Sequence, residues 1–486
     1  MSARAETREP AARDQRLVAT WLTTMLAVFL LMVVLGITMR LSQGAVVSLS
    51  FPDFYAIMTM HGLGMAGSLF AAGIAMVWFV AARYARPSRA AMWIAYALFV
   101  AGAVALLVAT LVGKFAAGWY ALYPLPFLKA TWPSWATGAT IIALMAMGLA
   151  WLVAQLDILR ALAAEYGIGR MFAWDRFRRQ DGAPVPAAVL IASVCAVAGI
   201  LGTIVGAATL MMYLFKWFAP ATEFDPLLLK NSMFMFGHTI VNVAMYCGIC
   251  VIYELMPGFT GRPWKVTRTV VLAWNATLLF ILFAYFHHLY MDFAQPLALQ
   301  VLGQIASYGS AVPATAVTVF GLGSQIHRSG LRWSFVPAAF TLGILGWVLG
   351  GITAVVDSTI AVNLVFHNTL WVPAHFHTYF LVGYVLILLG FLFQLLRSGA
   401  ERLAKVGLAV MVAGGYTFVL MFFLGGMDSV PRRFATYQTI PYPWLVERAT
   451  ELAKWGAGAG SVFLVGALIF CVSLVLGRRR SANPDE

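Results

Sequence analysis

The stretch HNTLWVPAHFHTYFLVGYVLILLGFLFQLL, residues 367–396, joins three histidines to an apolar run that is long enough to cross a bilayer. About 20 apolar residues in a helix span the hydrocarbon core. An imidazole inside that core is costly unless it is hydrogen-bonded, hydrated or bound to another group. The stretch therefore predicts a membrane helix, and it raises the question of what His367, His375 and His377 bind.

The rest of the chain has the composition of such helices. Of its 486 residues, 62% are hydrophobic and only 10% are charged. Twelve apolar segments reach spanning length: 17–39, 54–81, 91–113, 133–156, 186–214, 231–256, 266–290, 302–325, 335–356, 370–396, 404–425 and 456–477. We therefore expect an all-α integral membrane protein of about twelve helices, forming a single polytopic domain over residues 1–486.

The basic residues indicate the orientation of the chain. If the N-terminus is cytoplasmic, 23 of the 32 basic residues fall in cytoplasmic segments, as the positive-inside rule requires. We expect a multi-pass protein of a bacterial or archaeal cytoplasmic membrane, with cytoplasmic tails at residues 1–16 and 478–486. The net charge of +13 is scattered over short loops. It therefore indicates contact with anionic membrane lipid and argues against nucleic-acid binding.

Six of the eight histidines fall at one depth in this topology. Four different spans place them in the outer third of the bilayer, at 1.5 Å per residue along each helix. They are His61, His238, His287, His288, His375 and His377. Such clustering of imidazoles within a membrane is what haem groups and transition metals require.

The spacing limits which of these histidines can share one ion. His375 and His377 point roughly 200° apart on one helix, so they can bind two different metals but not the same one. The adjacent His287 and His288 diverge by roughly 100°. Their rings can still converge on one ion near a helix end, if a third ligand joins from another helix.

Four motifs then carry a resemblance to a known family. They are IMTMHGLG at 57–64, FMFGHT at 234–239, AYFHHLYMDF at 284–293 and PAHFHT at 373–378. In this order they resemble subunit I of the haem–copper oxidase superfamily over essentially the whole chain. The fragment HNTLWVPAHFH is most similar to the B-type branch. The resemblance implies a helical subunit I bundle with two haems and a non-haem metal.

The resemblance also implies which residues hold the haems. His61 and His377 would be the axial ligands of a low-spin haem, expected to be of b type. His375 would be the proximal ligand of a high-spin haem of b, o or a type. Arg432 and Arg433 match an arginine pair that contacts haem propionates in the family, and guanidinium groups suit carboxylates.

The non-haem metal of the family would lie against the high-spin haem. The resemblance assigns it to His238, His287 and His288. Imidazole binds both iron and copper. We expect iron because of the family branch, with copper as the alternative. His367 would lie near the propionates and has no implied ligand role.

One position departs from the oxygen reductases of the family. In their A and B types, a tyrosine linked to the helix-six histidine follows it by one helical turn. The chain has Asn242 there, on the same helix face as His238. C-type enzymes supply the tyrosine from before the histidine pair, where this chain has Ile281. Tyr285 remains as a substitute one turn further on.

This departure decides which gas we expect the site to reduce. Cleaving O2 in one step takes four electrons, one of them from the tyrosine, whereas coupling two NO molecules takes two. We therefore expect the catalytic subunit of a nitric oxide reductase, 2 NO + 2 H⁺ + 2 e⁻ → N2O + H2O. Asn242 would ligate the metal or donate a hydrogen bond to the substrate.

Two alternatives stay open. One is a B-type terminal oxygen reductase with a displaced tyrosine. The other is a haem-bearing membrane subunit or transporter without gas chemistry, although a transporter needs no such histidine set. The chain has no CxxCH haem-attachment motif and no cupredoxin domain. We therefore expect a second subunit that carries copper or a c-type haem and passes electrons to this one.

The carboxylates suggest where the protons come from. All 19 Asp and Glu residues lie in loops or near span ends. Those on the outer side near the histidines are Asp292, Asp357 and Asp428. We therefore expect protons to enter from outside without pumping. A path of hydroxyls through Tyr253, Thr315 and Thr318 is the alternative.

Overall fold

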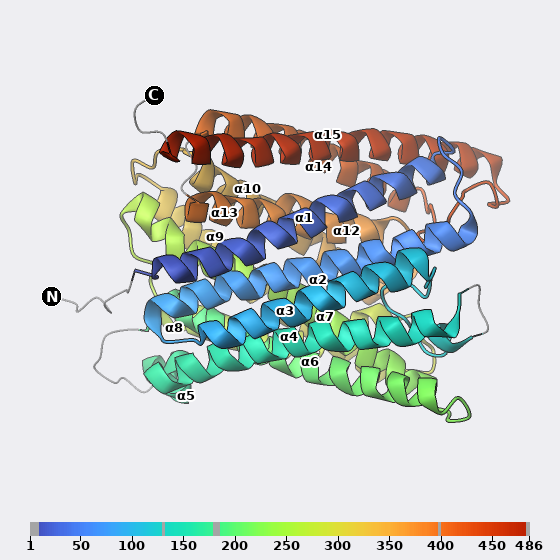
Figure 1. Ribbon diagram of the computed structural model, residues 1–486, viewed down its shortest axis with the longest axis horizontal. Coiled ribbons are helices and arrows are strands. Elements are labelled where there is room, and N and C mark those ends of the chain that lie inside the picture. Colours follow the sequence, from blue (N-terminus) through green and yellow to red (C-terminus); the bar gives the residue numbers. More distant parts are fainter. Residues whose placement is uncertain (1–8, 129–131, 178–184, 397–399, 483–486) are drawn as a thin grey trace. The chain divides into compact units, whose positions relative to one another are not determined.

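The computed structural model describes residues 9–128, 132–177, 185–396 and 400–482, without the side chains of 478–482. Within these ranges, eleven helices are long and apolar enough to cross a membrane (Figure 1). They are α1 Ala12–Gln43, α2 Phe51–Tyr84, α3 Arg89–Leu107 with the π-helical turn η1 Val108–Val112, α4 Ser134–Tyr166, α6 Ala187–Phe218, α7 Pro226–Thr260, α9 Leu297–Ile326, α10 Phe335–Asp357, α12 Trp371–Tyr379 with η5 Phe380–Tyr384 and α13 Val385–Leu396, α14 Glu401–Met427 and α15 Pro443–Ala482.

The twelfth predicted span, 266–290, has a mixed structure. It contains the shorter helix α8, Arg268–Ile281, and the 3₁₀ segment η4, Ala284–Leu289. Short helices α5 (Ile168–Met171) and α11 (Ile360–Phe366) and the 3₁₀ segments η2 (Leu125–Phe127) and η3 (Trp174–Phe177) lie in the connections. The predicted all-α membrane fold is confirmed, and each predicted span corresponds to helical structure in the described ranges.

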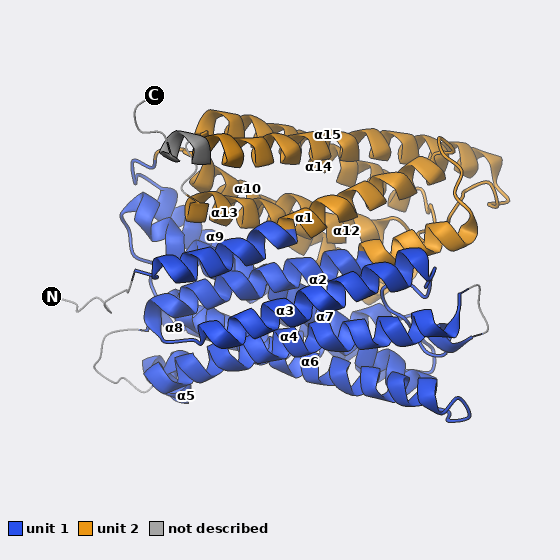
Figure 2. Cartoon of the chain, viewed as in Figure 1, with its two compact units in different colours: residues 1–25, 62–331 blue, residues 26–61, 332–486 orange. Residues whose placement is uncertain are grey.

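The chain divides into two compact units (Figure 2). Unit 1 comprises residues 1–25 and 62–331, and unit 2 comprises residues 26–61 and 332–486. Helix α1 begins at Ala12 and α15 extends to Ala482, so both predicted tails are partly helical. The single polytopic domain and the cytoplasmic side of the tails stay predictions. Residues 1–8 and 483–486 lie outside the described residues.

Local sequence signals set the helix starts in unit 1. The Ser88 hydroxyl accepts from Ala91 N at the start of α3, and Thr267 does the same for Val270 N at α8. Asp225 caps α7 and is followed by a proline at the first helical position. Side by side lie α3 and α4, α4 and α6, α6 and α7, and α8 and α9.

Small residues bring the helices of unit 2 close together. Helices α14 and α15 run side by side (Figure 1). A Cβ added to Gly414 would lie 2.5 Å from Phe463 N, and one added to Gly407 would lie 2.8 Å from Gly466 O. A Cβ on Gly346 of α10 would come within 2.1 Å of Val382 O in η5. Such close backbone approach is typical of membrane helix pairs, and it fixes the segment that follows His375 and His377.

Candidate metal and haem-binding centres

Three histidines of unit 1 converge on one point. His238 lies on α7, and His287 and His288 lie on η4. One nitrogen of each ring lies within 4.8 Å of the others. The ring centroids are 4.9 Å apart for His238 and His287, and 4.2 Å apart for His287 and His288. His287 and His288 lie after the regular helix α8 has ended. Adjacent side chains on a regular helix diverge by roughly 100°, so the change to the 3₁₀ segment η4 helps these two rings to converge.

Neighbouring side chains orient this cluster. The Nδ1 atom of His287 is 2.9 Å from Ser307 Oγ on α9, which leaves Nε2 of that ring for an ion. Ser307 in turn donates to the carbonyl of Gly303 at 2.6 Å. The ring of Phe234 stacks on His288 at 5.3 Å. A hydrogen bond to the second ring nitrogen is the usual way in which proteins fix a metal-binding histidine. The donor set therefore suits a transition metal ion.

Asn242 lies next to this cluster, one turn along α7. Its Nδ2 donates to the backbone carbonyl of His238 at 2.8 Å and lies 3.2 Å from Nε2 of the same residue. Because a carbonyl oxygen only accepts, this contact fixes which end of the amide is the nitrogen. The amide oxygen therefore points away from that carbonyl.

The candidate substitute, Tyr285, directs its hydroxyl elsewhere. The hydroxyl is 3.4 Å from Oδ1 of Asn231, and the ring stacks on Phe286 at 4.2 Å. Asn231 also accepts from Gln295 Nε2 at 3.0 Å. Asn231 and His238 are seven residues apart on α7, or about 10 Å along the axis. Ile281, at the C-type tyrosine position, is the last residue of α8 and is buried.

A second pair of histidines faces each other within unit 2. His61 of α2 and His377 of α12 have ring centroids 6.3 Å apart and planes within 18° of parallel. An ion that binds one nitrogen of each ring at about 2.0 Å would separate the centroids by roughly 6 Å. The pair therefore has the separation that two axial ligands of one metal require.

Backbone carbonyls select the facing nitrogens of this pair. His61 Nδ1 is 2.8 Å from Met32 O, and His377 Nδ1 is 2.7 Å from Pro373 O. Nε2 of each ring is then the atom available to an ion. A Cβ on Gly36 would lie 2.9 Å from His61 Cε1, so only glycine leaves room for this ring. These supporting residues were not predicted from the sequence.

His375 has different neighbours from His377 on the same short helix. Its ring meets Tyr379 edge-on at 5.6 Å and lies beside the backbone of Gly350 on α10. Its Nδ1 forms no hydrogen bond of good geometry with the part of the chain that the structure describes. The predicted divergence of His375 and His377 is thus observed, since His377 packs against Phe422 of α14 at 5.3 Å.

A buried arginine near this pair was missed from the sequence. Arg40 is 3% exposed and donates to Gln43 Oε1 at 2.7 Å and to Tyr437 OH at 3.2 Å. Its guanidinium carbon lies 4.7 Å over the ring of Phe422, which stacks on His377. Its Nε and Nη2 atoms find no acceptor among the described residues. A buried guanidinium of this kind fits a bound group that carries oxygen acceptors.

The predicted arginine pair lies after α14. Arg432 donates from Nε and Nη2 to Asn368 Oδ1, at 3.3 and 3.0 Å. Arg433 has a positive φ of 67°, and its carbonyl accepts from Tyr55 OH at 3.2 Å. Both are half-buried. The structure ties this loop to the segment before α12, because Arg432 N also donates to Asn368 O at 2.8 Å.

The outer carboxylates differ in their partners. Asp292 pairs with Lys230 at 2.6 Å, and Asp428 pairs with Arg448 at 2.8 Å. Asp357 is 3% exposed, and its Oδ1 has no hydrogen-bond partner in the described ranges. Two residues of the alternative hydroxyl path are in contact, since Tyr253 OH lies 3.1 Å from Thr318 Oγ1 in unit 1, and the path itself stays a prediction.

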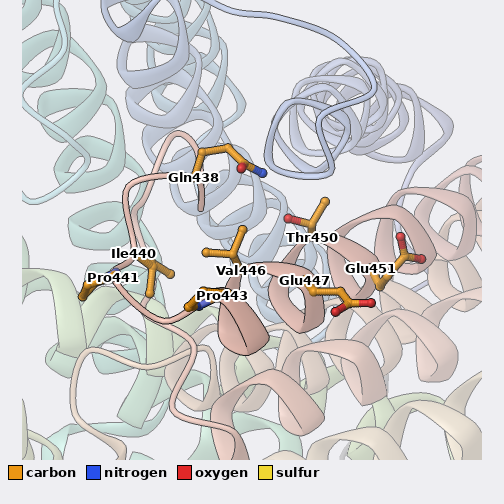
Figure 3. A pocket seen from close by; sticks show the side chains of 8 residues that line it. All are labelled: Gln438, Ile440, Pro441, Pro443, Val446, Glu447, Thr450 and Glu451. Carbon is orange, nitrogen blue, oxygen red and sulfur yellow. The ribbon is translucent and has the colours of Figure 1, made fainter.

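A groove of about 450 Å³ lies elsewhere on unit 2 (Figure 3). It is open at the surface and lies around the start of α15. Its lining consists of Gln438, Ile440, Pro441, Pro443, Val446, Glu447, Thr450 and Glu451. None of the predicted site residues lines it.

Comparison with known proteins identifies the family. The chain matches the family described as "Cytochrome C and Quinol oxidase polypeptide I" over residues 16–479. It belongs to this family. The family is one of membrane oxidoreductases that bind haem groups and a further metal, in agreement with the donor sets described above.

Curated relatives agree on the family. The chain is 26% identical over 470 residues to "Cytochrome c oxidase subunit 1" of Thermus thermophilus, covering 89% of this chain and 78% of that protein. It is 29% identical over 269 residues to "Heme-copper oxidase subunit I+III" of Aeropyrum pernix, covering 53% of this chain but only 31% of that protein. It is 23% identical to "Probable quinol oxidase subunit 1" of Staphylococcus epidermidis over 52% of this chain and 39% of that protein.

A solved structure supports the fold. A chain of a heme-copper terminal oxidase dimer, determined by cryo-EM, superposes with a TM-score of 0.78. The superposition covers 96% of this chain and 84% of that chain, at 18% sequence identity. The predicted haem–copper oxidase subunit I bundle is therefore confirmed.

Proposed function

We propose that this chain is the catalytic subunit of a nitric oxide reductase within the family. The reaction is 2 NO + 2 H⁺ + 2 e⁻ → N2O + H2O. The observation that carries the proposal is a pair of contacts made by two asparagines of α7. Asn242 lies against His238 where oxygen reductases have a tyrosine, and the hydroxyl of Tyr285 bonds to Asn231 instead.

The electron count explains why this residue matters. A tyrosine at the site donates one of the four electrons that split O2, and an amide has no accessible oxidation of that kind. Coupling two NO molecules needs only the two electrons that the metals hold. The Asn242 amide oxygen, turned away from the His238 carbonyl, contributes either a neutral ligand or an acceptor, while its Nδ2 lies against the His238 carbonyl and Nε2.

The histidines form three ligand sets, one for each of two haems and one for a non-haem metal. His61 and His377 would bind a low-spin haem, and His375 a high-spin haem. The cluster of His238, His287 and His288 would bind non-haem iron, with copper as the alternative. The haems supply electron transfer and gas binding when present. The chain itself orients the ligand rings through Met32, Pro373 and Ser307.

Arginines would hold the polar edges of the haems. Arg40 has two nitrogens without acceptors among the described residues, and it lies one aromatic ring away from His377. Arg432 and Arg433 suit propionate carboxylates. Guanidinium groups placed near an oxidised haem also alter its potential, since they disfavour the added positive charge.

The remaining assignments concern the surroundings of the subunit. Both termini would be cytoplasmic, by the distribution of basic residues. A second subunit with copper or a c-type haem would deliver the electrons. Protons would enter from the outer side.

An oxygen reductase is the second candidate. The curated relatives are named as cytochrome c and quinol oxidases, and the hydroxyls of Tyr253 on α7 and Thr318 on α9 lie 3.1 Å apart. An oxygen reductase requires another electron donor for O–O cleavage. Tyr285 could donate that electron only if its hydroxyl broke its hydrogen bond to Asn231.

The proposal is tested on the purified complex with an artificial electron donor under anaerobic conditions. We expect one N2O for every two NO consumed. The variant His375→Ala, checked for intact membrane insertion, should give none. Rapid O2 uptake without N2O formation in the wild type would overturn the proposal and favour the second candidate.

A further inference from the structure

Four aromatic side chains of unit 1 contact one another in a line. Tyr246 and Tyr253 lie seven residues apart on α7, or roughly 10 Å along its axis. Trp274 of α8 bridges them edge-on, with ring centroids 5.5 Å from Tyr246 and 6.1 Å from Tyr253. Trp264 stacks on Tyr253 at 3.7 Å. Since each ring packs against the next at the distances usual for aromatic pairs, these four side chains form an aromatic relay.

One end of the aromatic relay is joined to the histidine cluster. The hydroxyl of Tyr246 donates to the carbonyl of Ser310 on α9 at 3.5 Å. Ser310 Oγ donates to the carbonyl of Ser307 at 3.0 Å, and Ser307 Oγ lies 2.9 Å from His287 Nδ1. Tyr246 also follows His238 on α7 by eight residues, or about 12 Å along the axis. Hydrogen bonds and one helix therefore connect the relay to two ligands of the proposed metal site.

The other end of the relay lies at the surface. Trp264 is half-buried in the connection between α7 and α8, and the next residue, Lys265, is exposed. A Cβ added to Gly321 of α9 would lie 2.5 Å from Trp264 Cζ2, so α9 holds the indole in place. The other three rings of the relay are at most 3% exposed. Trp264 is therefore the ring that a molecule in solution can reach.

The residue types of the relay favour electron transfer. All four are tyrosine or tryptophan, the side chains that most readily lose a single electron. Packing alone does not explain Trp274, because its buried Nε1 finds no acceptor of good geometry among the described residues, and a phenylalanine would avoid that cost. The contrast is unit 2, where three phenylalanines pack against His377: Phe376, Phe418 and Phe422.

We propose that the aromatic relay carries single electrons from its surface end at Trp264 to the metal site of the histidine cluster when that site meets hydrogen peroxide. The inference rests on the metal set of the proposed function. It adds a protective reaction, H2O2 + 2 H⁺ + 2 e⁻ → 2 H2O, which takes no electrons from the second subunit. The two electrons come from a one-electron reductant in solution, such as ascorbate.

The electrons and protons of this reaction balance. Peroxide is reduced with cleavage of its O–O bond, ascorbate is oxidised, and the two protons come from water. Within the relay no bond between heavy atoms forms or breaks, since each ring loses one electron and regains one from the next ring. The hydrogen bond between Tyr253 OH and Thr318 Oγ1, at 3.1 Å, lets the phenolic proton shift when that ring is oxidised and return when it is reduced.

The first test treats the whole complex with hydrogen peroxide in the absence of any electron donor, so that the electrons are taken from the relay itself. Peptide mass spectrometry then locates the oxygen adducts. We expect more adducts on Trp264 than on Trp93 of α3, which lies off the relay and is 45% exposed. In Trp274→Phe the adducts on Trp264 should fall to the level of Trp93. The control Trp78→Phe, which replaces a buried tryptophan of α2, should leave them unchanged.

Either of two results would overturn the relay: adducts that follow exposure in the wild type, or adducts on Trp264 that persist at the wild-type level in Trp274→Phe. If Trp274→Phe loses its haems, Tyr253→Phe decides. That variant removes only a hydroxyl, and it should lower the adducts on Trp264 in the same way.

A photochemical measurement needs no bound metal, so it separates failure of the relay from failure of the proposed function. A ruthenium photosensitiser is attached at Lys265→Cys in a Cys471→Ala background, because the other three cysteines are buried. Flash oxidation beside Trp264 should produce a transient tyrosyl radical, which is lost in Tyr253→Phe and kept in the control Tyr96→Phe. A tyrosyl signal of equal yield in both variants would overturn the relay, whichever gas the protein reduces.

Discussion

At the scale of single residues, the proposed chemistry depends on the side chain that lies next to His238. The motif spacing was enough to predict that Asn242 shares its helix face, and the structure places the two side chains in contact. The sequence could not show that the amide nitrogen is held by the His238 carbonyl, because that depends on the side-chain rotamer.

Replacing this asparagine should impair the chemistry and leave the cofactors in place. For Asn242→Ala we expect N2O formation to fall about tenfold or more, because a polar group at the reacting atoms is lost. The matched control is Asn231→Ala on the same helix, which should change turnover little. Rates are compared after haem and metal contents are shown to be equal. If Asn242→Ala and Asn231→Ala form N2O at the same rate, Asn242 has no part in the mechanism.

The histidine pair of unit 2 makes a second residue-scale prediction. In Gly36→Ala the new Cβ would lie 2.9 Å from His61 Cε1, so we expect the ring to move and the low-spin haem signal to be lost or shifted. Gly458→Ala, where nothing lies within 4 Å of an added Cβ, is the control. Electron paramagnetic resonance of the oxidised protein reports the ligand geometry. An unchanged signal in Gly36→Ala would argue against His61 as an axial ligand.

At the scale of elements, twelve spans could be predicted because apolar length is a strong signal. The early end of α8 could not be predicted, because the residues from Phe283 to Leu289 are apolar or aromatic apart from the two histidines. Nor could Arg40 be recognised, although a lone arginine at the end of an apolar span was a visible signal. Its importance comes from Phe422 and Tyr437, which are distant in sequence.

The contact between α9 and η4 should control metal binding. A Cβ on Gly303 would lie 2.7 Å from Phe286 Cβ and 3.1 Å from His287 N. We expect Gly303→Ala to displace η4 and to lower the non-haem metal content while haem content persists. Gly323→Ala on the same helix, with open space around it, is the control. Elemental analysis of both variants checks this. Full metal occupancy in Gly303→Ala would mean that the cluster does not depend on this contact.

At the scale of the whole molecule, the resemblance named the family correctly because its histidine motifs occur in order along the entire chain. Each ligand set that the sequence predicted for one ion is found within one unit: His238, His287 and His288 in unit 1, and His61 with His377 in unit 2. In the proposed function the gas that is reduced depends on one side chain, Asn242, among 486, so similarity over the whole length does not test it.

The ratio of nitric oxide turnover to oxygen turnover in one preparation distinguishes a nitric oxide reductase from an oxygen reductase. Both rates are measured with the same electron donor and expressed as electrons per complex per second. We predict that NO reduction, with stoichiometric N2O, exceeds O2 reduction by about tenfold or more, since Asn242 occupies the position of the tyrosine that would donate the fourth electron. An O2 rate equal to or above the NO rate would contradict the account and would direct attention to Tyr285.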